Sequence, residues 1–132
     1  MTTGTQGTSA RKYHTDQVHY LVRPIVYTTL SYSLGKRPAG SLVIDAGVVV
    51  TTPFAGGTPQ TVDMGPSSDP DGYATALVVT AAGKKVADEL ATSDDLYTAV
   101  DLEETVTISA GATPSAGAGY AYVAYVMANR AA

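Results

Sequence analysis

Hydrophobic and polar residues alternate along the part of the chain that follows residue 16. Between residues 17 and 34 most apolar side chains occupy even positions, while the odd positions are largely polar. A period of two indicates a β-strand that buries one face. Pro24 has no N–H to donate, so we expect it on an edge strand or at a bulge that bends or splits the strand. A turn or loop should follow over residues 35–40.

The later segments also have the character of strands. Residues 41–52 and 120–128 are apolar on both faces, which is typical of strands inside a sandwich or at an oligomer interface. Shorter strands are predicted over 60–64, 73–80, 96–102 and 104–110, separated by turn-forming residues. One short helix is predicted over 83–91, where Val86 and Leu90 form an i, i+4 apolar pair. Seven or eight strands predict an all-β fold, an antiparallel β-sandwich of the jelly-roll type.

Residues 1–16 have a different composition from the rest. They lack periodicity and are rich in Thr, Gly and Ser, which predicts a flexible N-terminal arm preceding one sandwich domain over 17–132. The arm has neither the basic nor the apolar region of an export signal. The longest apolar runs are too short for a membrane span of about 20 residues, so we expect no membrane association.

Charge is distributed unevenly over the 132 residues, whose net charge is −4. Residues 1–40 contain five basic side chains and one acidic one, whereas residues 41–132 contain three basic and eleven acidic ones. A body this acidic repels a nucleic-acid backbone, so no direct nucleic-acid binding is expected. The basic start of the chain is suited to an acidic neighbour, including another copy of the protein. With 45% apolar residues, disorder throughout the chain is excluded.

Few residues offer metal or thiol chemistry. The absence of cysteine excludes disulfides, zinc–thiolate sites and thiol nucleophiles. His14 and His19, the only histidines, point to opposite faces if both lie in one extended strand, so no metal site of the cupin type is expected. The segment Asp69-Pro70-Asp71-Gly72 fits either a turn or an oxygen-rich calcium loop. The turn is favoured, because the spacing of further oxygen ligands in a calcium loop is missing.

Catalytic groups are equally scarce. The pairs Asp94-Asp95 and Glu103-Glu104 flank a predicted strand, where solvated surface charge is favoured over acid–base chemistry. There is no G-x-S-x-G motif, and no glycine-rich stretch precedes a Lys-Ser/Thr pair. We therefore predict a protein that is not an enzyme, with no catalytic residue, no cofactor and no metal.

Tyrosines are concentrated in the last predicted strand. Tyr120 and Tyr122 share one face of that strand and Tyr125 lies on the other. Aromatic residues on both faces indicate that one side packs on the core and the other on a neighbour. Tyr120, Tyr122 and Tyr125 are thus predicted at an oligomer interface, with a core confined to the domain as an equal alternative. A carbohydrate-binding module is a further alternative, which the absence of tryptophan disfavours.

Four segments together resemble a known family. They are residues 40–54 (GSLVIDAGVVVTTPF), 62–65 (VDMG), 69–73 (DPDGY) and 117–126 (GAGYAYVAYV). Over residues 40–128 the chain resembles small jelly-roll virion proteins of tailed bacteriophages, among them capsid decoration or cement proteins. The resemblance implies a non-enzymatic homotrimer, made in the host cytoplasm and bound to the major capsid protein on the outside of the phage head. A neck, tail or fibre component is the alternative.

The predicted arm fits attachment to such a shell. Ordering 15 residues costs on the order of 15–30 kcal/mol in backbone entropy. The arm is too polar to offset this by apolar burial, so we expect it to become ordered through hydrogen bonds and salt bridges on a partner. Arg11, Lys12 and Tyr13 are the residues expected to contact an acidic capsid surface. Three copies on one site would add avidity.

Overall fold

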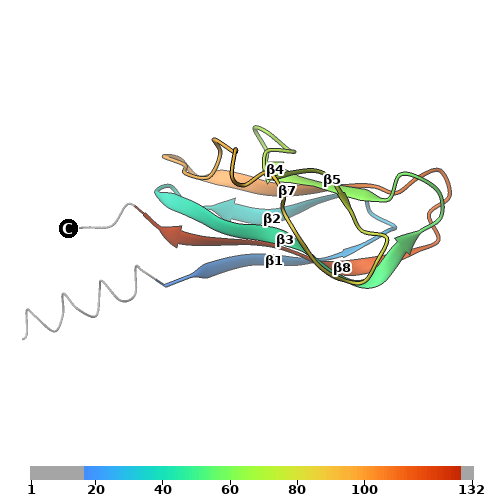
Figure 1. Ribbon diagram of the computed structural model, residues 1–132. Coiled ribbons are helices and arrows are strands. Elements are labelled where there is room, and N and C mark those ends of the chain that lie inside the picture. Colours follow the sequence, from blue (N-terminus) through green and yellow to red (C-terminus); the bar gives the residue numbers. More distant parts are fainter. Residues whose placement is uncertain (1–16, 129–132) are drawn as a thin grey trace, which may run out of the picture.

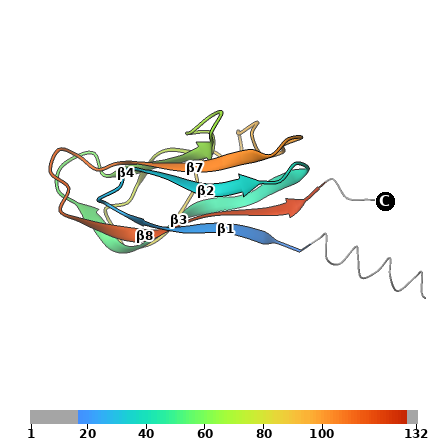
Figure 2. The same ribbon diagram turned by 180° about the vertical axis from the view of Figure 1, so that it is seen from behind.

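The computed structural model describes residues 17–128, which form two stacked antiparallel sheets (Figures 1 and 2). Each sheet has four strands, and these residues contain no helix. The strands are β1 (His19–Val26), β2 (Ser31–Arg37), β3 (Ser41–Ala55), β4 (Thr61–Pro66), β5 (Ala74–Val78), β6 (Gly83–Val86), β7 (Leu102–Ser109) and β8 (Ala116–Met127).

Strand pairing follows the jelly-roll arrangement. The first four strands pair in reverse order with the last four: β1 with β8, β2 with β7, β3 with β6, and β4 with β5. Contacts of β3 with β8 and of β4 with β7 then complete sheets of order β1-β8-β3-β6 and β2-β7-β4-β5. The predicted all-β, antiparallel jelly-roll sandwich is therefore confirmed.

The core lies between the two sheets and is built by alternation along each strand. In β3, Val48 is buried while Val49 beside it is exposed, and in β7 Val106 and Ile108 point inward. Inward side chains from both sheets form one continuous cluster, which also includes Ile25 and Val123. Removing this apolar surface from water is the main stabilising contribution to the sandwich.

Pro24 lies where its chemistry requires. It belongs to β1, an edge strand of its sheet. No strand pairs with β1 on its open side, so the missing N–H costs no hydrogen bond to another strand there. The single strand expected over 17–34 is split, because a turn at residues 27–28 separates β1 from β2. The tyrosine of β2 fixes this corner: the Tyr32 hydroxyl accepts a hydrogen bond from the Val26 amide (2.9 Å) and donates one to the Val26 carbonyl (3.1 Å).

The helix predicted over 83–91 is wrong. Gly83–Val86 is the short strand β6, paired with β3, and turns follow it. Gly83 has a φ of +121°, which is incompatible with a right-handed helix. A weak helical propensity over two turns cannot compete with the hydrogen bonds that the open edge of β3 offers.

Other strands also differ from their predicted ranges. The strand predicted over 96–102 is reduced to one isolated bridge, between Leu42 and Tyr97, inside a long connection from β6 to β7. The break predicted between the strands 96–102 and 104–110 is also wrong, since Glu103 lies inside β7. β3 and β8 extend beyond the predicted ranges because they pair with each other along most of their length. Among the described residues no helical segment could cross a membrane.

Candidate functional site

The outward face of the sheet β2-β7-β4-β5 is polar. Ser31, Thr107 and Asp63 lie side by side across β2, β7 and β4, and Ser33 neighbours Thr105 in the same way. The Ser33 hydroxyl also donates a 2.7 Å hydrogen bond to the Glu103 carboxylate. Hydroxyl and carboxylate groups of this kind are well hydrated, so this face is suited to contact with water.

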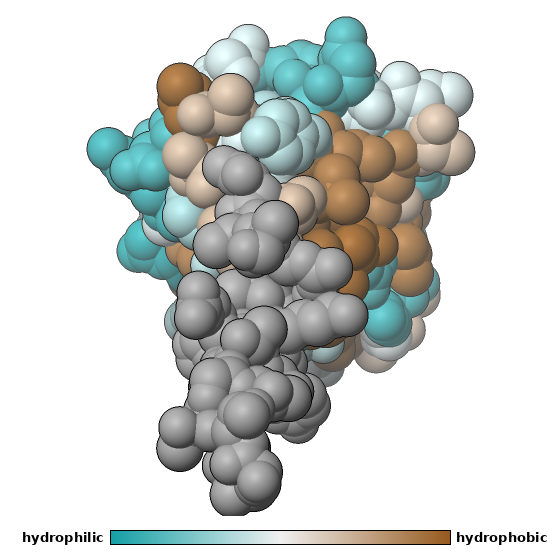
Figure 3. All heavy atoms as spheres, turned by 90° about the vertical axis from the view of Figure 1, so that its left-hand side faces the viewer, coloured by the Kyte–Doolittle hydropathy of each residue, from teal (hydrophilic) through white to brown (hydrophobic). Residues whose placement is uncertain are grey.

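The outward face of the other sheet is apolar. We call it the apolar face and define it by seven residues of β1, β3, β6 and β8: Tyr20, Val22, Pro24, Val49, Val86, Tyr120 and Tyr122. In register, one row across the sheet runs Pro24, Tyr120, Val49, Lys84, and the next runs Val22, Tyr122, Gly47, Val86. In the end view of Figure 3, hydrophobic residues gather mainly on the right-hand flank, beside hydrophilic residues at the top and on the left.

Two charged side chains lie on the same outward face, Lys84 on β6 and Asp45 on β3. The Lys84 ammonium lies 3.7 Å from the Asp45 carboxylate and 5.4 Å from the centre of the Tyr122 ring. The Tyr122 hydroxyl donates a 3.2 Å hydrogen bond to Asp45. These contacts, first the Tyr122 hydroxyl and then the Asp45 charge, raise the pKa of Lys84 above its ordinary value. Burial raises the pKa of Tyr122. The charges on this face are therefore a cation and an anion that are already paired.

The three predicted interface tyrosines lie on the expected faces of β8, but they differ in exposure. Tyr120 is 48% exposed and stands on the apolar face. Tyr122 shares that face but is covered within its own chain by Lys84. Tyr125 points to the opposite side, where its ring stacks on that of His19 at 5.3 Å. Only Tyr120 offers a large free surface, and Tyr20 and Val22 of β1 offer more. The even positions of this strand were expected to face the core, which is wrong for Tyr20 and Val22, because the odd position Ile25 is the buried one.

The predicted arm residues Arg11, Lys12 and Tyr13 lie outside the described residues, as does His14. The point where the arm joins the sandwich is described. β1 begins at His19, which pairs with Tyr125 near the end of β8. Both ends of the described chain therefore leave the sandwich at the same end of the same sheet (Figure 1).

A buried ion pair joins the two halves of the chain. Arg37 of β2 and Glu104 of β7 are both fully buried, and the Arg37 Nε–H donates to the Glu104 carboxylate. The Tyr73 hydroxyl, also buried, donates a 2.9 Å hydrogen bond to the same carboxylate oxygen. Burial raises the pKa of Glu104 and the pKa of Tyr73. The expectation that Glu103-Glu104 is solvated charge is thus wrong for Glu104.

The rest of the Arg37 guanidinium fixes the connection between β6 and β7. It donates hydrogen bonds to the carbonyls of Ser41 (3.1 Å), Leu96 (2.9 Å) and Asp95 (2.9 Å). The long connection has little regular pairing of its own, so these bonds hold it against the sandwich. The group is satisfied on all sides and has no access to a ligand, which makes its role structural.

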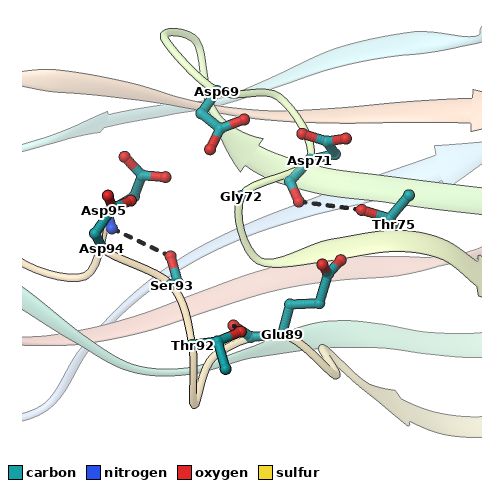
Figure 4. A pocket seen from close by; sticks show the side chains of 9 residues that line it. All are labelled: Asp69, Asp71, Gly72, Thr75, Glu89, Thr92, Ser93, Asp94 and Asp95. Atoms are coloured by element: carbon teal, nitrogen blue, oxygen red, sulfur yellow. Dashed lines mark hydrogen bonds between the residues drawn. The ribbon is translucent and has the colours of Figure 1, made fainter.

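Acidic residues line a surface pocket beside this connection (Figure 4). The pocket is lined by Asp69, Asp71, Gly72, Thr75, Glu89, Thr92, Ser93, Asp94 and Asp95. Hydrogen bonding to Asp95 and then to Asp71 raises the pKa of Asp69 to about 6. The Gly72 amide donates a 2.8 Å hydrogen bond to the Asp69 carbonyl, so this segment forms the predicted turn. No metal-binding group of three or more ligands occurs among residues 17–128.

Comparison with known proteins adds one structural likeness. No protein-family model matches the chain, and no curated protein matches it. A chain of the cyanophage Pam1 capsid asymmetric unit is similar in structure, with a TM-score of 0.64 and 15% sequence identity. The alignment covers 84% of this chain and 85% of that chain. At this identity the likeness concerns the fold, which the two chains share over most of their length.

Proposed function

We propose that this protein is a non-enzymatic virion structural protein, a capsid decoration protein that binds the outside of a phage head and stabilises the shell. The proposal is carried by the structural likeness to a chain of a phage capsid asymmetric unit, which extends over most of both chains. Its partner is the major capsid protein of the virion.

The sandwich has the rigidity that such a role requires. β3 and β8 pair over most of their length, and the Arg37–Glu104 ion pair ties β2 to β7 in the interior. The polar outward face of the sheet β2-β7-β4-β5 suits the solvent around a particle. A stiff domain adds to the strength of a shell because it resists deformation wherever it is anchored.

Attachment is assigned to the basic arm of residues 1–16, with Arg11, Lys12 and Tyr13 on the capsid. The arm joins the sandwich at one end, so the domain can stand on the shell with that end inward. In a homotrimer three arms would leave from neighbouring copies. Their joint binding would be much stronger than that of one arm, because the second and third contacts form at high effective concentration.

The experiment is reconstitution on shells that lack the protein. Purified protein is added to such heads, and the bound particles are imaged by electron cryo-microscopy and heated. The proposal predicts density distributed over the whole head and a higher bursting temperature than for bare heads. Density confined to the neck, tail or fibres would refute the decoration role in favour of another virion location. No binding to any part of the particle would refute both.

The arm is tested with one pair of charge reversals. Lys12→Glu should weaken binding to the heads, because it places a negative charge where we expect contact with an acidic surface. Lys36→Glu, an exposed site in β2, changes the net charge equally and should leave binding near the wild-type level. Equal binding by the two variants would contradict the assignment of the arm.

A further inference from the structure

We propose that the apolar face is the surface on which a second copy of this chain binds, so that the protein assembles in solution before it meets any partner. The inference deepens the proposed function, on which it rests for its biological role, by naming the surface through which the oligomer forms. It does not depend on the shell, because the contact is between copies of one chain.

The exposed area is close to what a stable contact needs. Tyr20 is 63% exposed and Val22 54%, although both lie in a regular strand beside Tyr120. Covering the whole apolar face would remove about 500 Å² from water on each copy, where a standard interface removes about 800 Å² per partner. An apolar patch of this size lies at the upper end for a monomer. The polar residues around it would supply the remaining area.

The chemistry of the face matches the core of an interface. Aromatic residues are enriched there and charged ones are depleted, with polar groups kept to the rim. Tyr120 stands in the row between Pro24 and Val49, with Tyr20 on the edge strand. The charged groups of the face, Asp45 of β3 and Lys84 of β6, are paired with each other. The large exposed aromatic side chains therefore lie toward β1 and β8, and the ion pair lies toward β3 and β6.

Charge favours a second copy as the occupant. The described sandwich, residues 17–128, has eleven acidic side chains against five basic ones, so two such bodies repel each other on average. The apolar face is an exception, because Lys84 already balances Asp45 at 3.7 Å. Two copies can meet there without bringing like charges together. Contact with the shell is meanwhile assigned to the basic arm, which leaves this face free for assembly.

Molar mass in solution tests the proposal directly. Light scattering after size-exclusion chromatography should give a multiple of the chain mass for the wild type. Val22→Glu and Tyr120→Glu should weaken association roughly tenfold or more, because each places a charge at the centre of the contact. Matched controls lie outside the apolar face: Val78→Glu, 56% exposed in β5, and Tyr97→Glu, 51% exposed. Both controls should keep the wild-type mass.

A second measurement keeps the test decisive if a glutamate variant fails to fold. The chain has no cysteine, so Val22→Cys and Val78→Cys each create one labelling site. A maleimide should label residue 22 roughly tenfold or more slowly than residue 78, because only residue 22 is covered by the neighbouring copy. Equal labelling rates would overturn the proposal. A wild-type mass of one chain, or an oligomer that Val22→Glu leaves intact, would also overturn it.

The two proposals fail in different ways. If the apolar face is not an interface, the mass in solution is that of one chain, whatever the protein does with phage heads. If the decoration role is wrong, the wild type still assembles and Val22→Glu still dissociates it, while no particle is bound. Measuring mass and head binding on the same preparations therefore separates the outcomes.

Discussion

The buried ion pair gives the sharpest prediction about stability. Replacing Arg37 by Met keeps an unbranched side chain of similar length but removes the charge opposite Glu104. The Glu104 carboxylate is then left in the interior with only the Tyr73 hydroxyl as a donor. The carbonyls of Leu96 and Asp95 lose the hydrogen bond from Arg37 in the same step, although Leu96 still accepts one from the Val43 amide.

The expected loss is large compared with the total stability. Removing one partner of a buried ion pair costs about 3–5 kcal/mol, and an ordinary domain is stable by about 5–15 kcal/mol. With a typical dependence on urea, the unfolding midpoint of Arg37→Met should fall by roughly 2 M. Because burial already raises the pKa of Glu104, the unpaired carboxyl should take up a proton. The loss caused by Arg37→Met should therefore become smaller as the pH is lowered.

Urea unfolding followed by circular dichroism measures these effects. Arg37→Met/Glu104→Met removes both charges, so it should be more stable than Arg37→Met alone. Lys36→Met, next to Arg37 but exposed, is the control and should change the midpoint little. A decrease in the free energy of unfolding of less than about 1 kcal/mol for Arg37→Met would refute the reasoning. It would mean that the Glu104 carboxylate is not desolvated, since leaving a desolvated carboxylate without its partner costs more than this. A double variant no better than the single one would refute the unpaired charge as the cause.

Two further predictions concern the acidic pocket and a close approach of the chain. Asp69 has its pKa raised to about 6, mainly by Asp95, so its contribution to folding stability should be fully present below about pH 4 and be lost as the pH rises through 6. Asp69→Asn should flatten this part of the curve in urea unfolding. Gly117→Ala should lower the melting temperature more than Gly83→Ala, since both have positive φ but only the first places a methyl group against the Phe54 ring.

Alternation made most of the sandwich predictable from the sequence. Strand β7 buries every second side chain, and this pattern is visible in the order of its residues. The pairing of β1 with β8 is not visible in the order of residues, because residues more than ninety positions apart meet there. The β6 segment was predicted as a helix for the same reason. Four residues contain too little pattern to show that the edge of β3 lies beside them.

The sequence analysis missed the Arg37–Glu104 ion pair because a β-bulge shifts the alternation of buried and exposed positions within β2. Glu104 follows the same even positions as Val106 and Ile108, so its inward direction was visible in the sequence. In β2 the buried residues begin on even positions, at Tyr32, but the register shifts between Ser33 and Gly35. After the bulge an odd position faces inward, and it holds Arg37. The one available signal for this pair was Glu104, a charged residue at a position that the alternation along β7 places on the buried face.

Because side chains alternate between the two faces of a strand, the sheet that carries the apolar face uses different residues for folding and for the proposed contact between copies. Folding requires only its inward residues, such as Val48 and Ala121, to be apolar. The outward neighbours Val49 and Tyr120 add nothing to the core, and the polar outward face of the other sheet shows that this fold does not need apolar residues there. Charged substitutions on the apolar face should therefore prevent association and lower the unfolding midpoint only by the concentration-dependent stabilisation that association itself supplies. A substitution one residue along the strand, such as Val48→Ala, should do the reverse: it lowers stability by the cost of an internal cavity and leaves the contact surface in place.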